Sequence, residues 1–165
     1  ANLPYNISVP VVLHLLELFP SLREVLVMVQ LEVAQRLAAT PGGKVYGVPS
    51  VKARWYGDVA TAGTVPRTIF WPVPNVDSGL VRVVRRELSR DSSQRKPVFA
   101  LIDAAFGQRR KALRSALAGV LGGAQRSGHV LARAGIPELA RGEQLSIDDF
   151  IRIAEYDQQT AAEVL

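Results

Sequence analysis

The sequence contains no cysteine, and this absence excludes disulfide bonds, cysteine-ligated zinc and thiol catalysis. Its two histidines, His14 and His129, stand far apart, so we expect no histidine-based metal site and no bound metal. No apolar run approaches the length that spans a bilayer, and we expect no signal peptide. A chain without thiols or membrane segments is typical of the reducing cytoplasm, where we expect it to function.

The charge of the chain is positive and unevenly distributed. The 165 residues have a net charge of +5, with 16 arginines and 4 lysines against 15 acidic residues. Residues 82–114 hold ten basic and three acidic side chains, whereas residues 115–165 hold four basic and seven acidic ones. Such a basic zone predicts a surface that binds a polyanion, and arginine suits phosphate because its planar fork binds bidentately. A solvated helix face is the alternative that charge alone leaves open.

Residues 2–8, with the sequence Asn-Leu-Pro-Tyr-Asn-Ile-Ser, carry the strongest chemical signal. The Asn2 carboxamide oxygen can accept one proton of an amine. The Pro4 carbonyl can accept a second, because proline fixes the turn and has no competing N–H. The Tyr5 ring offers a face on which a base can stack. This arrangement suits the amino group of an adenine, and a plain loop with a turn-forming proline and a buried tyrosine is the alternative.

The apolar pattern predicts an α/β portion followed by a helical one. The β-branched run at 24–30 is apolar on both faces, which is typical of a strand in a parallel sheet covered on both sides. A polar stretch at 88–96 predicts a boundary between a sheet domain at 1–88 and a helical domain at 89–165. Further strands are expected at 59–70, with interruptions at Gly63 and Pro66, and at 80–85. Helices are expected at 9–19, 32–39, 50–56 with Ser50 as cap, 97–106, 109–121, 130–134, and after a Ser146 cap.

Six separated stretches carry a further pattern. They are residues 2–8, Met28-Val29-Gln30-x-Glu32-Val33-Ala34-x-Arg36-Leu37, Tyr46-Gly47-x-x-Ser50-Val51, Phe70-x-Pro72-x-Pro74-x-Val76-Asp77-Ser78, Phe106-x-Gln108-Arg109-Arg110-Lys111-x-Leu113-Arg114 and Arg141-Gly142-Glu143-Gln144-Leu145-Ser146-x-x-Asp149-Phe150. In order and spacing they resemble the ribosomal RNA adenine dimethyltransferases of the KsgA/RsmA type, here a bacterial member. The resemblance covers essentially the whole chain, with one departure at Gly142, where alanine is expected.

The resemblance implies an α/β fold: the C-terminal half of a Rossmann-like, S-adenosylmethionine-dependent methyltransferase sheet, followed by a small all-α domain. In the intact enzyme, methyl groups pass from S-adenosylmethionine to N6 of two adjacent adenosines of small-subunit rRNA, and the partner is the immature 30S particle. Asn2 and the Pro4 carbonyl are expected to accept the amine protons. Tyr5 and Phe70 are expected to stack on the two faces of the flipped adenine. Asn2 and Leu3 are expected to contact the donor.

The resemblance also assigns the basic zone to rRNA. Arg109, Arg110 and Lys111, with Arg114 one turn on, are expected to contact the RNA backbone from the start of a helix. Consecutive helical residues fan out by about 100° each, so these side chains cannot all be buried. The aromatic residues expected to pack in the core rather than on RNA are Trp55, Tyr56 and Trp71.

One family feature is missing, because no Gly-x-Gly turn follows a predicted strand to hold the methyl donor. We therefore expect the C-terminal portion of the enzyme, inactive by itself, whose strand at 24–30 forms a bare edge that self-associates. Two alternatives are a non-catalytic RNA-binding module for ribosome assembly and a large-subunit rRNA adenine methyltransferase that confers antibiotic resistance. The stretches at 108–111 and 141–146 argue against the second.

Overall fold

The computed structural model describes residues 1–4, 6–86 and 92–162, with side chains described as far as residue 160. The chain divides into two compact units. The sheet unit comprises Ala1–Thr40 and Lys44–Leu88, and the helical unit comprises Pro41–Gly43 and Ser89–Leu165. None of the helices in the described ranges is long and apolar enough to cross a membrane.

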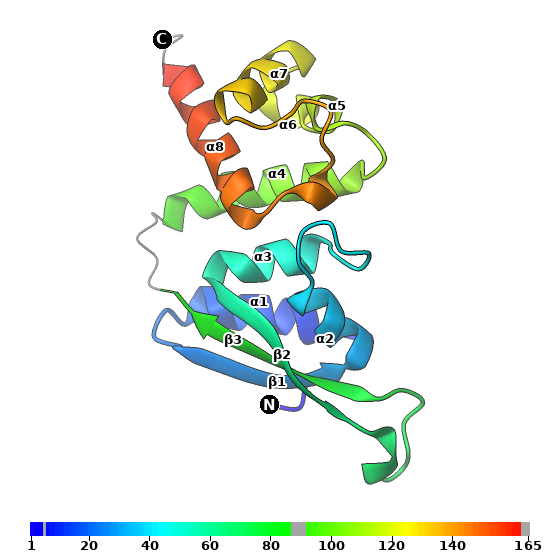
Figure 1. Cartoon of the computed structure of the whole chain (residues 1–165). Coiled ribbons are helices and arrows are strands. Elements are labelled where there is room, and N and C mark those ends of the chain that lie inside the picture. Colours follow the sequence, from blue (N-terminus) through cyan, green and yellow to red (C-terminus); the bar gives the residue numbers. More distant parts are fainter. Residues whose placement is uncertain (5, 87–91, 163–165) are drawn as a thin grey trace. The chain divides into compact units, whose positions relative to one another are not determined.

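The sheet unit contains a three-stranded antiparallel sheet. Its strands are β1 (Glu24–Gln30), β2 (Gly57–Val65) and β3 (Ser78–Arg85), in the order β1-β3-β2 (Figure 1). β3 returns from β2 through the loop between them, and it pairs antiparallel with both β1 and β2. The parallel pairing expected for β1 is therefore not found among these three strands. It occurs at the outer edge of β1, where Asn2 forms a parallel bridge with Met28.

Three helices pack on one face of this sheet: α1 (Ser8–Leu18), α2 (Leu31–Ala38) and α3 (Val48–Tyr56) (Figure 1). Val27 and Val29 of β1 are buried beneath them. Leu26 points to the opposite face, because side chains alternate along a strand, and it is 48% exposed. Within the described residues, β1 is thus covered on one face only, although its sequence is apolar on both.

The start of α3 differs from the expected Ser50 cap. The helix begins at Val48, and Ser50 lies inside its first turn. The Ser50 hydroxyl accepts a hydrogen bond from the Gly47 amide at 3.1 Å and donates one to the carbonyl of Arg36. Ser50 is fully buried and therefore ties α3 to α2.

A loop at residues 66–77 joins β2 to β3 and contains the short 3-10 helix η1 (Arg67–Ile69). The loop is closed by hydrogen bonds between its two ends. The Arg67 amide donates to Oδ1 of Asp77 at 2.9 Å, and its guanidinium donates to the carbonyl of Asn75 at 3.3 Å. Its conformation is further restricted by prolines, which fix φ.

The helical unit is built from short helices and one long one. They are η2 (Ser92–Gln94), α4 (Arg95–Gly107), α5 (Leu113–Ala116), α6 (Ala118–Leu121), α7 (Ala124–Arg133), η3 (Gly142–Gln144) and α8 (Ile147–Ala162). The helix expected at 109–121 is wrong in its first part. Residues 108–111 form a turn in which the Lys111 amide donates to the Gln108 carbonyl at 2.8 Å. The extended backbone of Ala112, with ψ of 147°, separates this turn from α5.

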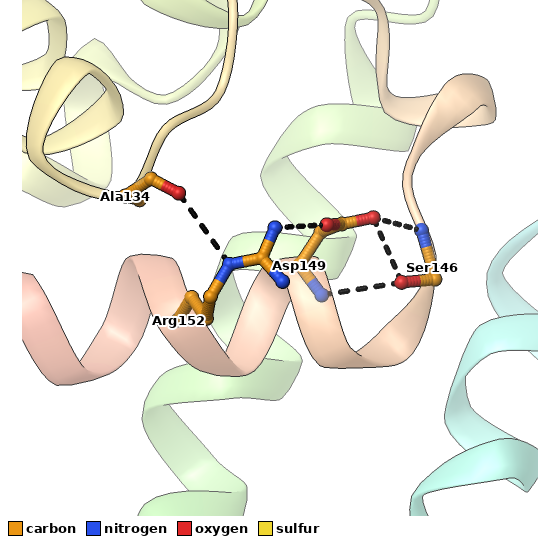
Figure 2. Close-up of polar contacts among 4 residues, drawn as sticks. All are labelled: Ala134, Ser146, Asp149 and Arg152. Atoms are coloured by element: carbon orange, nitrogen blue, oxygen red, sulfur yellow. Dashed lines mark hydrogen bonds and ion pairs between the residues drawn. The ribbon is translucent and has the colours of Figure 1, made fainter.

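The expected Ser146 cap of α8 is confirmed (Figure 2). The Ser146 hydroxyl accepts from the Asp149 amide at 3.3 Å, and the Asp149 carboxylate accepts from the Ser146 amide at 2.7 Å. Such reciprocal bonds satisfy amides that a helix start leaves unpaired. Arg152 binds the same carboxylate and donates to the carbonyl of Ala134 at the end of α7. The cap thereby joins α8 to α7.

Candidate functional site

A cavity of about 440 Å³ in the sheet unit brings together the start of the chain and the loop at 66–77. Its lining residues are Asn2, Leu3, Pro4, Met28, Phe70, Trp71, Pro72 and Pro74. Three of the residues expected to handle a base, Asn2, Pro4 and Phe70, therefore line one cavity, although Phe70 is distant in sequence from the other two. Tyr5, the fourth, lies outside the described residues.

Residues 1–3 are held against β1 by backbone hydrogen bonds. The Met28 amide donates to the Ala1 carbonyl at 2.8 Å, and the Leu3 amide donates to the Met28 carbonyl at 3.1 Å. These bonds fix the backbone of Asn2, whose exposed carboxamide has no hydrogen-bonding partner among the described residues. The expected bare edge of β1 is consequently paired along part of its length.

The Pro4 carbonyl was expected to be unoccupied, but it accepts one hydrogen bond, from the Ile7 amide at 3.3 Å. That bond lies beyond the usual N–H···O range of 2.7–3.2 Å. A carbonyl oxygen has two lone pairs, so one remains for a ligand.

The aromatic residues divide between core and cavity. Trp55 and Tyr56, at the end of α3, are 2% and 3% exposed, which confirms core packing for both. Core packing is wrong for Trp71, which is 94% exposed at the rim of the cavity. The reason is tertiary: Trp71 belongs to the proline loop beyond the ends of β2 and β3, where none of the described helices of the sheet unit covers it.

Sequence reasoning also missed Met28 as a lining residue. Its side chain lies on the sheet face opposite the helices and contributes to the cavity wall. The signal was present, because alternation places residue 28 on the face opposite Val27 and Val29. Without the strand register, however, nothing linked residue 28 to the loop at 66–77.

Three basic residues of the helical unit line a hollow of about 620 Å³, whose lining residues are Phe106, Gly107, Gln108, Arg109, Arg110 and Lys111. Because 108–111 form a turn, the expected helical fan of side chains does not apply. The four predicted RNA contacts are all exposed, but they are not equivalent.

Two of these four residues are held in ion pairs. Nε of Arg109 lies 2.7 Å from a carboxylate oxygen of Glu143, and Nη1 of Arg114 lies 3.1 Å from one of Glu138. Among the described residues, the side chains of Arg110 and Lys111 have no hydrogen bond or ion pair.

The structure adds Arg141 to this surface. The carbonyl of its neighbour Ala140 accepts from the Leu113 amide at 2.8 Å, which places residue 141 beside the segment that follows the turn. The exposed Arg141 guanidinium has no partner in the described ranges. Sequence reasoning missed it because residues 141 and 111 are thirty positions apart.

Comparison with known proteins decides the family. Residues 1–159 match the family model "Ribosomal RNA adenine dimethylase". The chain belongs to the ribosomal RNA adenine dimethylase family. Its similar relatives include "Ribosomal RNA small subunit methyltransferase A" from Streptomyces coelicolor, 59% identical over 157 residues, and from Leifsonia xyli, 61% identical over 155 residues. These alignments cover 94% and 93% of the chain, and the chain spans 55% of each relative, about half its length.

Solved structures show that the fold is that of rRNA adenine dimethylases. A dimethyladenosine transferase from Plasmodium falciparum superposes with a TM-score of 0.83 at 23% identity, over 97% of this chain and 66% of that one. The 23S rRNA methyltransferase ErmE superposes with a TM-score of 0.68 at 22% identity, over 96% of this chain and 64% of that one. The predicted family and its Rossmann-like α/β fold are both confirmed.

Among the described residues, no acid–base group lines the cavity. None of its eight described lining residues is titratable. Lowered carboxyl pKa values occur elsewhere: the pKa of Asp58 is lowered chiefly by a hydrogen bond from Arg86, and that of Glu24 by one from Arg82. No group of three or more potential metal ligands occurs in the described part of the chain. The described lining residues offer a carboxamide, aromatic faces and apolar surface to a ligand.

Proposed function

We propose that this chain supplies the base-binding part of an S-adenosylmethionine-dependent enzyme that dimethylates N6 of two adjacent adenosines in small-subunit rRNA. The observation that carries the proposal is the convergence of Asn2, Pro4 and Phe70 on one cavity of about 440 Å³. That volume lies in the range of small-ligand pockets. The relatives named as small-subunit rRNA methyltransferases belong to the same functional class.

The lining residues would act by orientation. The Asn2 carboxamide oxygen and the second lone pair of the Pro4 carbonyl accept the two N6–H protons. Their acceptance aligns the nitrogen lone pair with the methyl carbon, and such alignment accelerates transfer without a covalent intermediate. Phe70 stacks on one face of the flipped base, and we assign the other face to Tyr5.

S-adenosylmethionine supplies the methyl group when it is bound. Asn2 and Leu3 fit its reactive end, since both line the cavity next to Pro4. The eight described lining residues include no charged side chain that could bind the donor's ammonium and carboxylate. We therefore assign to this chain only the contacts near the transferred methyl group.

We assign RNA binding to Arg110, Lys111 and Arg141, whose exposed cationic groups have no partner among the residues that the structure describes. Arg109 and Arg114 would hold the turn in place through their glutamate partners. Phosphate contacts of this kind position the substrate without reading its sequence. A small-subunit rRNA substrate in the immature 30S particle implies a cytoplasmic location.

A second function is supported by the assignment of the two surfaces to different units. The three cations assigned to RNA binding belong to the helical unit, whereas the described cavity residues belong to the sheet unit. The chain could therefore act as a non-catalytic RNA-binding module in ribosome assembly. Binding of immature small subunits without S-adenosylmethionine, unchanged by Asn2→Ala, would favour this function.

We also propose that the chain self-associates at the part of the β1 edge that residues 1–3 leave open, toward Glu24. Leu26, which is 48% exposed and whose carbonyl accepts from the Ala1 amine at 2.9 Å, adds apolar area at the boundary of that open part. Light scattering at high concentration should show oligomers, and Leu26→Lys should reduce them because a charge blocks edge pairing. A monomeric chain at high concentration would refute this proposal.

The catalytic proposal is tested by methyl transfer to small-subunit rRNA, measured with the full-length protein. Nucleoside mass spectrometry should detect N6,N6-dimethyladenosine. Asn2→Ala and Phe70→Ala should reduce the rate at least tenfold. The matched controls Asn75→Ala and Phe19→Ala, at exposed positions outside the cavity, should not. Equal rates in all four variants would refute the assigned site.

A further inference from the structure

Trp71 is the most exposed of the large apolar side chains described, with 94% of its surface accessible. It lies at the rim of the cavity and directly follows Phe70, which lines the same cavity. Ile69 and Val73, on either side of it, are 67% and 51% exposed. The proline loop therefore presents an apolar, aromatic surface that continues outward from the base cavity.

Trp71 belongs to a loop whose two ends are joined by hydrogen bonds. Arg67 donates to Asp77 and to the Asn75 carbonyl, so both ends of the loop are tied together. The Phe70 amide also donates to the Arg67 carbonyl at 3.2 Å. Pro72 follows Trp71 directly and fixes its own φ. A rigid aromatic platform loses little conformational entropy when a flat partner stacks on it.

We propose that Trp71 stacks on the nucleobase adjacent to the target adenine, so that Phe70 and Trp71 together hold two neighbouring bases of one RNA strand. The inference rests on the proposed function, which places the target base in the cavity. Successive Cα atoms are about 3.8 Å apart, so two consecutive aromatic residues can serve consecutive nucleotides. Every base has a π-face, so stacking tolerates any neighbour. Trp71 thus orients the strand that leads into the cavity.

The test measures the affinity of the full-length protein for an rRNA hairpin with two adjacent adenosines. Companion hairpins are abasic at the target, at its 5′ neighbour or at its 3′ neighbour. Trp71→Ala should weaken binding of the intact hairpin about 5- to 150-fold, which corresponds to the stacking energy of one base. Trp71→Phe should retain most of the affinity. The exposed-aromatic control Phe19→Ala should bind like the unaltered protein.

The abasic hairpins identify the contact. One neighbour-abasic hairpin should bind the unaltered protein weakly, and Trp71→Ala should weaken it no further, because the stacking partner is already absent. Equal losses on every hairpin, or no loss at all, would overturn the proposal. Unchanged thermal melting should accompany each variant, since Trp71 lies outside the core.

The same experiment distinguishes a failure of the Trp71 inference from a failure of the proposed function. If Phe70→Ala and the target-abasic hairpin show the same non-additivity while Trp71 shows none, the base cavity stands and only the Trp71 inference is overturned. If the intact hairpin is neither bound nor methylated, the proposed function and this inference both fail.

Discussion

The division of the basic residues into free and paired cations predicts how RNA affinity depends on salt. Arg110 and Lys111 have no side-chain partner among the described residues, whereas Arg109 and Arg114 are paired with Glu143 and Glu138. A cation that has no side-chain partner in the free protein can displace counterions from an RNA phosphate directly. A cation held by a carboxylate must first give up that pair. We therefore expect Arg110→Gln/Lys111→Gln to flatten the salt dependence of RNA binding.

The magnitude follows from counterion release. Each phosphate contact contributes about 0.7 to the slope of log affinity against log salt for single strands and about 0.9 for duplex. Loss of two contacts should lower the slope by about 1.4 to 1.8. Across a fourfold rise in salt, the unaltered protein should then lose about 7- to 12-fold more affinity than the variant. Fluorescence anisotropy with an rRNA hairpin at several salt concentrations measures both slopes.

The matched control is Arg109→Gln/Arg114→Gln, which removes the same charge from the same surface. The slope of its log affinity against log salt should change by less than the contribution of one phosphate contact. Its stability should fall instead, by about 0.2–1 kcal/mol per exposed ion pair. Equal slopes for the two double variants would refute the reasoning, because net charge would then account for the whole effect.

Three further predictions concern stability. Gly79→Ala should lower the free energy of unfolding of the sheet unit by about 1–3 kcal/mol in urea titrations, because its Cβ would lie 2.6 Å from that of Ala34. Asp149→Ala should cost the helical unit about 1 kcal/mol, measured by thermal unfolding, because it removes the carboxylate that accepts from the Ser146 amide in the reciprocal cap of α8. Asp58→Asn should destabilise by no more than about 1 kcal/mol at pH 7, since the pair with Arg86 is exposed. The lowered pKa of Asp58 means that its contribution is present above the ordinary carboxyl range and is lost as pH falls through and below it, so the two proteins should converge in acid.

Each of these three predictions would be contradicted by a specific result. Gly119→Ala meets nothing within 4 Å and lies in α6, so it should stabilise, and a loss equal to that of Gly79→Ala would contradict the steric argument. An unchanged melting temperature for Asp149→Ala would show that the carboxylate half of the cap is dispensable. A stability difference for Asp58→Asn that persists in acid would contradict the ion-pair origin.

Much of the candidate site could be predicted because its signals are local. Asn2 and Phe70 stand in motifs whose residue types specify hydrogen bonding and stacking within a few positions. The prediction that Trp71 packs in the core was wrong for a non-local reason, because its exposure depends on which elements cover the loop. The sequence also did not reveal that Arg109 is held in an ion pair. Its partner Glu143 is 34 positions away, and only the fold brings the two together.

The sequence by itself determined the element types and the family. A β-branched run makes β1, a serine followed by an aspartate caps α8, and six ordered stretches identify a member of the ribosomal RNA adenine dimethylase family. The tertiary structure alone decided the antiparallel pairing of β3 with β1 and the joining of Asn2 with Phe70 in one cavity. It alone also decided which cations are free. Local propensity depends on neighbours in the chain, whereas strand order, burial and ion pairing depend on neighbours in space.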